Sequence, residues 1–220
     1  MARAYHQRGF ALPPDATEVI LVRHGASAAL HPGERFALLD GHGDPPLAEA
    51  GERQAEAVAR RLASEPLAGL FVTGLRRTAQ TAAPLASLLG IAPVVVWELR
   101  EVHLGDWEGG EFRIRVTDGD PLALRVAAEE RWDVIPGAET MAALAQRVRA
   151  GIEAIVESVG PGATAAAFLH GGVIGEACRQ ATGSRPFAFV HADNASVTRL
   201  VVLGDGRWLL RSFNDTAHLG

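Results

Sequence analysis

The chain has 220 residues, of which 48% are hydrophobic, which predicts one folded domain over residues 1–220 rather than a disordered chain. Its net charge of -5 provides no positive field that would attract nucleic acid or an anionic membrane. All 21 basic residues are arginine, which excludes Schiff-base and P-loop lysine chemistry, and the single cysteine, Cys178, excludes an internal disulfide. We expect Cys178 to pack in the core.

The beginning of the chain has no apolar run of the kind a signal peptide needs, and no later stretch has the length of a membrane span. We therefore expect a soluble, cytoplasmic protein whose residues 1–17 form a flexible extension.

Short apolar runs then alternate with longer segments of helical periodicity, a pattern typical of parallel strands joined by crossover helices. The predicted strands are Glu18–Arg23, Gly69–Thr73, Pro93–Trp97, Ala163–Leu169 and Ser196–Leu203, the last forming a hairpin with Arg207–Phe213. The predicted helices are Glu49–Ser64, Leu75–Leu89 with a kink or restart at Pro84, Leu122–Glu130, Thr140–Val159 and Val173–Ala181. The fold class is therefore α/β with a mostly parallel sheet. Residues 105–137 are the least periodic, and we interpret them as an insertion that carries specificity.

Chemically active residues follow the predicted strands where these end. His24 follows the first strand and His170 the fourth, and each is followed by glycine. Ligands of open α/β sheets bind beyond the carboxyl ends of the strands, where both imidazoles would project. Arg23 lies beside His24, and the Arg76-Arg77 pair follows the second strand. Arginine forks together with the amino end of the helix after His170 favour a tetrahedral dianion such as a phosphoryl group.

These motifs resemble those of the histidine phosphatase superfamily, also called phosphoglycerate mutase-like. The resemblance covers nearly the whole chain and implies a three-layer α/β/α sandwich ending in a hairpin. It rests on four motifs in family order: Leu21-Val22-Arg23-His24-Gly25, Leu75-Arg76-Arg77-Thr78, Leu99-Arg100-Glu101 with the Gly105-Asp106-Trp107 that follows, and His170-Gly171-Gly172.

The resemblance implies a phosphohistidine mechanism on a small phosphomonoester, without metal or cofactor. His24 would be the nucleophile, with its second ring nitrogen held by the Gly25 carbonyl, and Glu101 the general acid and base. The phosphoryl oxygens would be bound by Arg23, Arg77 and His170, with further contacts from Ser27 and Gly171. Arg76 is expected to face solvent or pair with an acid. Leu30 replaces an asparagine that family members often have.

Several alternatives remain open at this point. Glu98 and Glu108 compete with Glu101 for the acid role, although the spacing to Gly105 and Trp107 favours Glu101. His103 would line the pocket entrance or bond a loop carbonyl, and the role of the loop Ala26–Gly43 is open. His6, His31, His42, His191 and His218 are expected to be surface or structural residues.

The function also has alternatives. A metal hydrolase would use His24, His103, Asp106 and His170 as ligands, but two arginines aimed at one point would repel a dication. A phospho-ligand binding domain would need neither nucleophile nor acid. Within the family, a mutase would carry arginine where this chain has Val102, so we favour phosphatase over mutase. The sequence does not identify the substrate, and it leaves a homodimer open.

Overall fold

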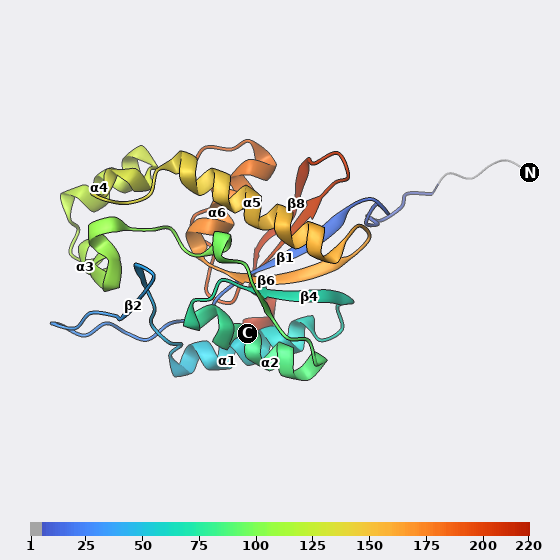
Figure 1. Cartoon of the computed structure of the whole chain (residues 1–220), viewed down its shortest axis with the longest axis horizontal. Coiled ribbons are helices and arrows are strands. Elements are labelled where there is room, and N and C mark those ends of the chain that lie inside the picture. Colours follow the sequence, from blue (N-terminus) through green and yellow to red (C-terminus); the bar gives the residue numbers. More distant parts are fainter. Residues whose placement is uncertain (1–5) are drawn as a thin grey trace, which may run out of the picture.

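The computed structural model describes residues 6–220, with a six-stranded sheet at its centre (Figure 1). The strand order is β5-β4-β6-β1-β7-β8, and β1, β4, β5 and β6 run parallel. The last two strands form the antiparallel C-terminal hairpin. The strands are β1 (Thr17–Arg23), β4 (Leu67–Val72), β5 (Val94–Val95), β6 (Thr164–Leu169), β7 (Val197–Val202) and β8 (Trp208–Asp215). The α/β class and the mostly parallel sheet with its terminal hairpin are confirmed.

Helices cover both faces of the sheet and give the expected three layers. Figure 1 shows α1 and α2 on one face and α5 and α6 on the other. The helices are α1 (Glu49–Leu62), α2 (Arg76–Leu89), α3 (Glu111–Thr117), α4 (Pro121–Glu129), α5 (Met141–Val159) and α6 (Gly171–Thr182). Of the two predicted alternatives at Pro84, a kink or a restart, the restart was wrong, because α2 continues through this residue.

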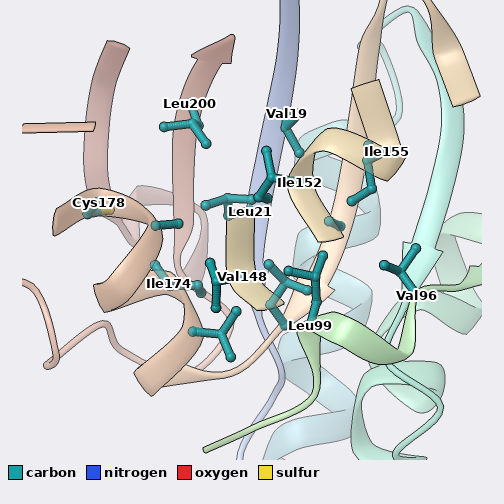
Figure 2. Close-up of a cluster of buried hydrophobic side chains, with 14 of the residues drawn as sticks. Val19, Leu21, Val96, Leu99, Val148, Ile152, Ile155, Ile174, Cys178 and Leu200 are labelled. Carbon is teal, nitrogen blue, oxygen red and sulfur yellow. The ribbon is translucent and has the colours of Figure 1, made fainter. Parts of the chain in front are cut away.

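Strand β1 divides its side chains between two hydrophobic cores. Val19 and Leu21 face α5 and α6, in the cluster that Figure 2 shows with Ile152 and Cys178, whereas Ile20 and Val22 face α1 and α2. This follows from the period of two along a strand, and it explains why both faces of the run are apolar. Burial raises the pKa of Cys178 to about 12, in keeping with its expected packing role.

Two sequence-based boundaries need correction. The predicted strand Pro93–Trp97 is reduced to Val94–Val95, because this edge strand pairs only with the end of β4 and the backbone then turns into a 3-10 helix at Trp97–Leu99. Strand β1 begins at Thr17, so the last residue of the expected extension belongs to the sheet. Residues 6–16 contain no helix or strand, and residues 1–5 of that prediction lie outside the described part.

The irregular segments of the sequence form ordered structure at one end of the molecule. The loop after β1 contains a small hairpin of β2 (Leu38–Leu39) and β3 (His42–Gly43). The segment 105–137 contains a 3-10 turn at Gly105–Gly110, then α3, α4 and another 3-10 turn at Trp132–Val134. Figure 1 shows α3, α4 and β2 gathered beyond the sheet. Together they enclose the edge where the parallel strands end.

Within residues 6–220, no helix has both the length and the apolar character needed to span a bilayer.

Candidate active site

One pocket of about 430 Å³ lies at the carboxyl ends of the parallel strands, and five of the predicted site residues line it. These five are Arg23, His24, Ser27, Arg77 and Glu101. Two others lie immediately behind: His170 is fully buried with its ring 5.3 Å from that of His24, and Gly171 is buried beside the side chain of Arg23. The fold therefore brings together all seven residues from four separate segments of the chain.

His24 is held in the form that a nucleophile needs. Its Nδ1 lies 2.7 Å from the Gly25 carbonyl oxygen, which only accepts, so Nδ1 carries the proton and Nε2 has a free lone pair. Burial, together with the charges of Arg77 and Arg23, holds the pKa of His24 well below its ordinary value. The imidazole is therefore neutral at neutral pH. The backbone is fixed as well, because the His24 N–H donates to Leu169 and Asn194 donates to the His24 carbonyl.

Arg77 and Arg23 supply two desolvated positive charges at this point. Arg77 is only 6% exposed and donates to the Gly43 carbonyl at 2.8 Å, while Arg23 donates to the Ala192 carbonyl. Burial lowers the pKa of both guanidinium groups, and the charge of Glu101 opposes this shift. Arg76, by contrast, is half exposed and contacts Asp44, as expected. Each guanidinium group already donates one hydrogen bond to a backbone carbonyl, but its other N–H donors remain. Two such groups facing one site favour an anion there.

His170 forms the floor behind His24. Burial and the nearby charge of Arg77 hold its pKa well below the ordinary value. Its Nε2 lies 2.9 Å from the Thr73 hydroxyl, and Nδ1 has no hydrogen-bond partner within the described chain. Thr73 follows β4, so the end of this strand supplies the polar partner of His170. Gly171 begins α6, whose free N–H groups point toward the same end of the sheet.

Glu101 is the carboxyl group best placed to move a proton. Burial raises its pKa from the ordinary value, although the Val102 N–H and the charges of Arg77 and Arg23 act in the opposite direction. The competing Glu98 lines a different pocket. Glu108 does line this one, but its two carboxylate oxygens already accept the backbone N–H groups of Gly43 and Leu104. Glu108 thereby joins the small hairpin to the loop that follows Glu101.

Arg113 is a pocket residue that the sequence analysis missed. It projects from α3, donates to Ser27 Oγ at 2.6 Å and to the Ala28 carbonyl at 2.8 Å, and stacks over Phe36. Burial lowers its pKa, and so does the charge of Arg23. Ser27 thus has a positively charged donor beside it. The only sequence signal was the alternation of Arg113 and Arg115 along a short segment, which did not indicate which arginine faces inward.

The sequence analysis missed two more pocket residues, His42 and Asn194. The residues that it considered as metal ligands do not lie around one point. His42, expected on the surface or in a structural role, is 4% exposed and lines the pocket, and its ring centroid lies 5.1 Å from that of His103. Asn194, which holds the His24 backbone, lines the pocket too. His103 and Asp106, considered as metal ligands, line two other pockets. Instead of bonding a loop carbonyl, His103 accepts the Gly105 N–H through Nδ1.

Leu30 explains in part how the first loop and the insertion come together beside the pocket. The backbone φ angle of Gly110 is +103°, and a Cβ at this residue would lie 2.6 Å from Leu30 Cδ2. The position that often carries asparagine in the family therefore packs the first loop directly on the insertion.

Comparison with known proteins supports the same assignment. The family model of the histidine phosphatase superfamily (branch 1) matches residues 19–216. A Yersinia enterocolitica protein named "Probable phosphoglycerate mutase GpmB" is 30% identical over 92% of this chain and 94% of its own. The Arabidopsis thaliana "Phosphoglycerate mutase-like protein 4" is 31% identical over 93% of this chain and 88% of its own.

Among solved structures, a mycobacterial glucosyl-3-phosphoglycerate phosphatase superposes with a TM-score of 0.73 at 27% identity, covering 91% of this chain and 100% of that one. Phosphatases and mutases are therefore both represented among the relatives. The family match over most of the chain shows that this protein belongs to the histidine phosphatase superfamily, branch 1.

Proposed function

We propose that the protein hydrolyses phosphomonoesters through a phosphohistidine formed on His24, without a metal or cofactor. The observation that carries this proposal is the state of His24: Nδ1 is committed to the Gly25 carbonyl, Nε2 is free, and the buried Arg77 and half-buried Arg23 adjoin it. A neutral imidazole beside two guanidinium groups suits attack on a dianionic phosphoryl group.

The reaction divides into two displacements. In the first, His24 Nε2 attacks phosphorus, the P–O ester bond breaks, and the leaving oxygen takes the proton of Glu101. The charges of Arg23 and Arg77, together with a hydrogen bond from the N–H of the neutral His170, stabilise the charge on the equatorial oxygens. In the second, Glu101, now a carboxylate, takes a proton from water as that water attacks the phosphohistidine. Inorganic phosphate leaves, and His24 and Glu101 return to their starting states.

A phosphoglycerate mutase is the second candidate, favoured by the names of the relatives that are about 30% identical. In a mutase, the phosphoryl group passes from the histidine to another hydroxyl and water must be kept out. Where mutases carry an arginine after the acid, this chain has Val102, which is 2% exposed and lines the pocket. This apolar replacement supports hydrolysis over transfer between positions of phosphoglycerate.

The test is phosphate release from a panel of phosphorylated metabolites by the wild type and two histidine variants. His24→Ala should abolish release and the acid-labile phosphoenzyme trapped with radiolabelled substrate. His31→Ala, which changes an exposed histidine of the neighbouring loop, is the matched control and should retain both. Unchanged turnover in His24→Ala would contradict the nucleophile assignment. Rapid interconversion of 3- and 2-phosphoglycerate with negligible phosphate release would replace hydrolase by mutase.

A further inference from the structure

The pocket has two chemically different halves. The phosphoryl end contains His24, Glu101, Arg23 and Arg77. The other end is a wall of large apolar side chains drawn from the first loop, the segment after Glu101 and the insertion. This set, called the aromatic wall below, consists of Phe36, Leu104, Trp107, Phe112 and Trp132. At about 430 Å³, the pocket is in the range that holds a whole organic ligand, so the alcohol part of a substrate would lie against this wall.

The side chains of the aromatic wall are held in place by packing on one another and on a small hydrophobic core. Trp107 and Phe112 pack with ring centroids 6.2 Å apart, Phe112 and Trp132 are 6.0 Å apart, and Trp132 continues to Phe187 at 4.7 Å. Behind these rings lies a small core that contains the buried Val126 and Ile135. Rings held in this way lose little freedom when a ligand packs on them, which favours binding of a flat apolar group.

The charged groups of this half are already paired. Both oxygens of Glu108 accept backbone N–H groups, and its negative charge faces the pocket. Arg113 uses both terminal nitrogens on Ser27 and the Ala28 carbonyl. A substrate carboxylate placed here would meet the charge of Glu108 and would have to draw Arg113 from its partners. An uncharged ring meets neither cost.

We infer that the preferred substrates are phosphate monoesters whose alcohol carries an aromatic ring, and that carboxylate-bearing phosphoglycerates are poor substrates. This inference rests on the proposed function. The chemistry is unchanged: the ester P–O bond breaks, the apolar alcohol leaves with a proton from Glu101, and water releases inorganic phosphate from His24. The ring selects the substrate by burial against the aromatic wall.

The experiment compares three esters of aliphatic alcohols: 2-phenylethyl phosphate, ethyl phosphate and 3-phosphoglycerate. An aromatic ester of a phenol would be cleaved faster for its leaving group alone, and this choice avoids that bias. Burial of a phenyl-sized group predicts that kcat/KM for the phenylethyl ester exceeds that for the ethyl ester by about 10-fold or more. The same measurement on 3-phosphoglycerate should give a value no higher than that of the ethyl ester.

Three variants connect the preference to the wall. Phe112→Ala and Phe36→Ala should each lower kcat/KM for 2-phenylethyl phosphate by about 10-fold and change ethyl phosphate by about twofold or less. Phe36 lies on a loop outside the small core, so its variant keeps the test valid if Phe112→Ala destabilises the fold. Phe189→Ala is the control, because Phe189 is half-buried and pairs with Phe213 away from the pocket.

The results separate this inference from the function on which it rests. A preference for 3-phosphoglycerate, or an equal loss for both alkyl esters in the Phe36 and Phe112 variants, would overturn the aromatic class while hydrolysis stands. Absence of phosphate release from all three esters and of any phosphoenzyme would instead remove the proposed function.

Discussion

The space at Gly172 determines where Glu101 can lie, and filling it tests the acid role. A Cβ at residue 172 would be 2.5 Å from Val102 Cγ2 and 2.8 Å from Glu101 Oε1. Since carbon atoms pack best at about 3.5 Å or more, Gly172→Ala must displace Val102 by roughly 1 Å and move the carboxyl group with it. The neighbouring Gly171 is the matched control, because a Cβ there would come no closer than 3.4 Å, to Arg23 Nε.

The two variants share a gain in helix propensity, because both glycines lie in the first turn of α6. Overpacking should then make Gly172→Ala less stable than Gly171→Ala by about 1–3 kcal/mol in urea denaturation.

The effect on activity should depend on the leaving group. An alkoxide needs the proton that we propose Glu101 supplies, whereas 4-nitrophenolate leaves without one. In Gly172→Ala, kcat/KM for ethyl phosphate should fall by about 10²-fold, the lower end of general acid contributions, and much less for 4-nitrophenyl phosphate. Equal losses on the two substrates, or a Gly171→Ala variant with the same selectivity, would refute the reasoning that Gly172 makes room for the acid.

Three further predictions use paired or pH-dependent measurements. Arg77→Ala should reduce kcat/KM by about 10³-fold, whereas Arg76→Ala, at an exposed residue, should change it little. Equal losses in the two variants would contradict the assignment of Arg77 to the phosphoryl group. Arg113→Ala removes the charged donor beside Ser27 and should raise KM at least about 10-fold in steady-state assays. Arg115 is on the same helix but pairs with Glu111 and Asp120 in solvent, so Arg115→Ala should leave KM unchanged. Burial lowers the pKa of His170, so below about pH 6.5 the unfolded chain takes up a proton that the native state does not. The free energy of unfolding should therefore fall with decreasing pH by up to about 1.4 kcal/mol per unit from this group, and His170→Asn should show a shallower slope than the wild type in urea titrations.

The parts of the site that could be predicted are those with a local signal. His24 and His170 each end an apolar run, and parallel strands bring such ends to one edge whatever lies between them. The two cores likewise follow from the alternation along β1. These inferences needed only the strand pattern and the rule that connects parallel strands through helices.

The remainder depends on contacts between distant segments that have no periodic signal. Arg113 and Arg115 look equivalent in sequence, and the contacts of Arg113 with Ser27 and the Ala28 carbonyl show which face of α3 is turned inward. His42 lies in a loop whose strands are two residues each, too short for an alternation to be seen. The end of β5 was misplaced because an edge strand with one neighbour can stop wherever the backbone must turn.

The position of β1 between two different neighbours has a consequence for how the family can diversify. Its last residues are bonded on one side by β6, through Leu169, and on the other by the segment before β7, through Ser196 and Ala195. The proposed nucleophile, His24, is therefore anchored on both sides in the central sheet, the part that we expect to open only with global unfolding. The aromatic wall is built on loops and short helices outside the sheet and can be changed by mutation at little risk to that anchor. Substrate range can drift in evolution while the reacting atoms stay in place.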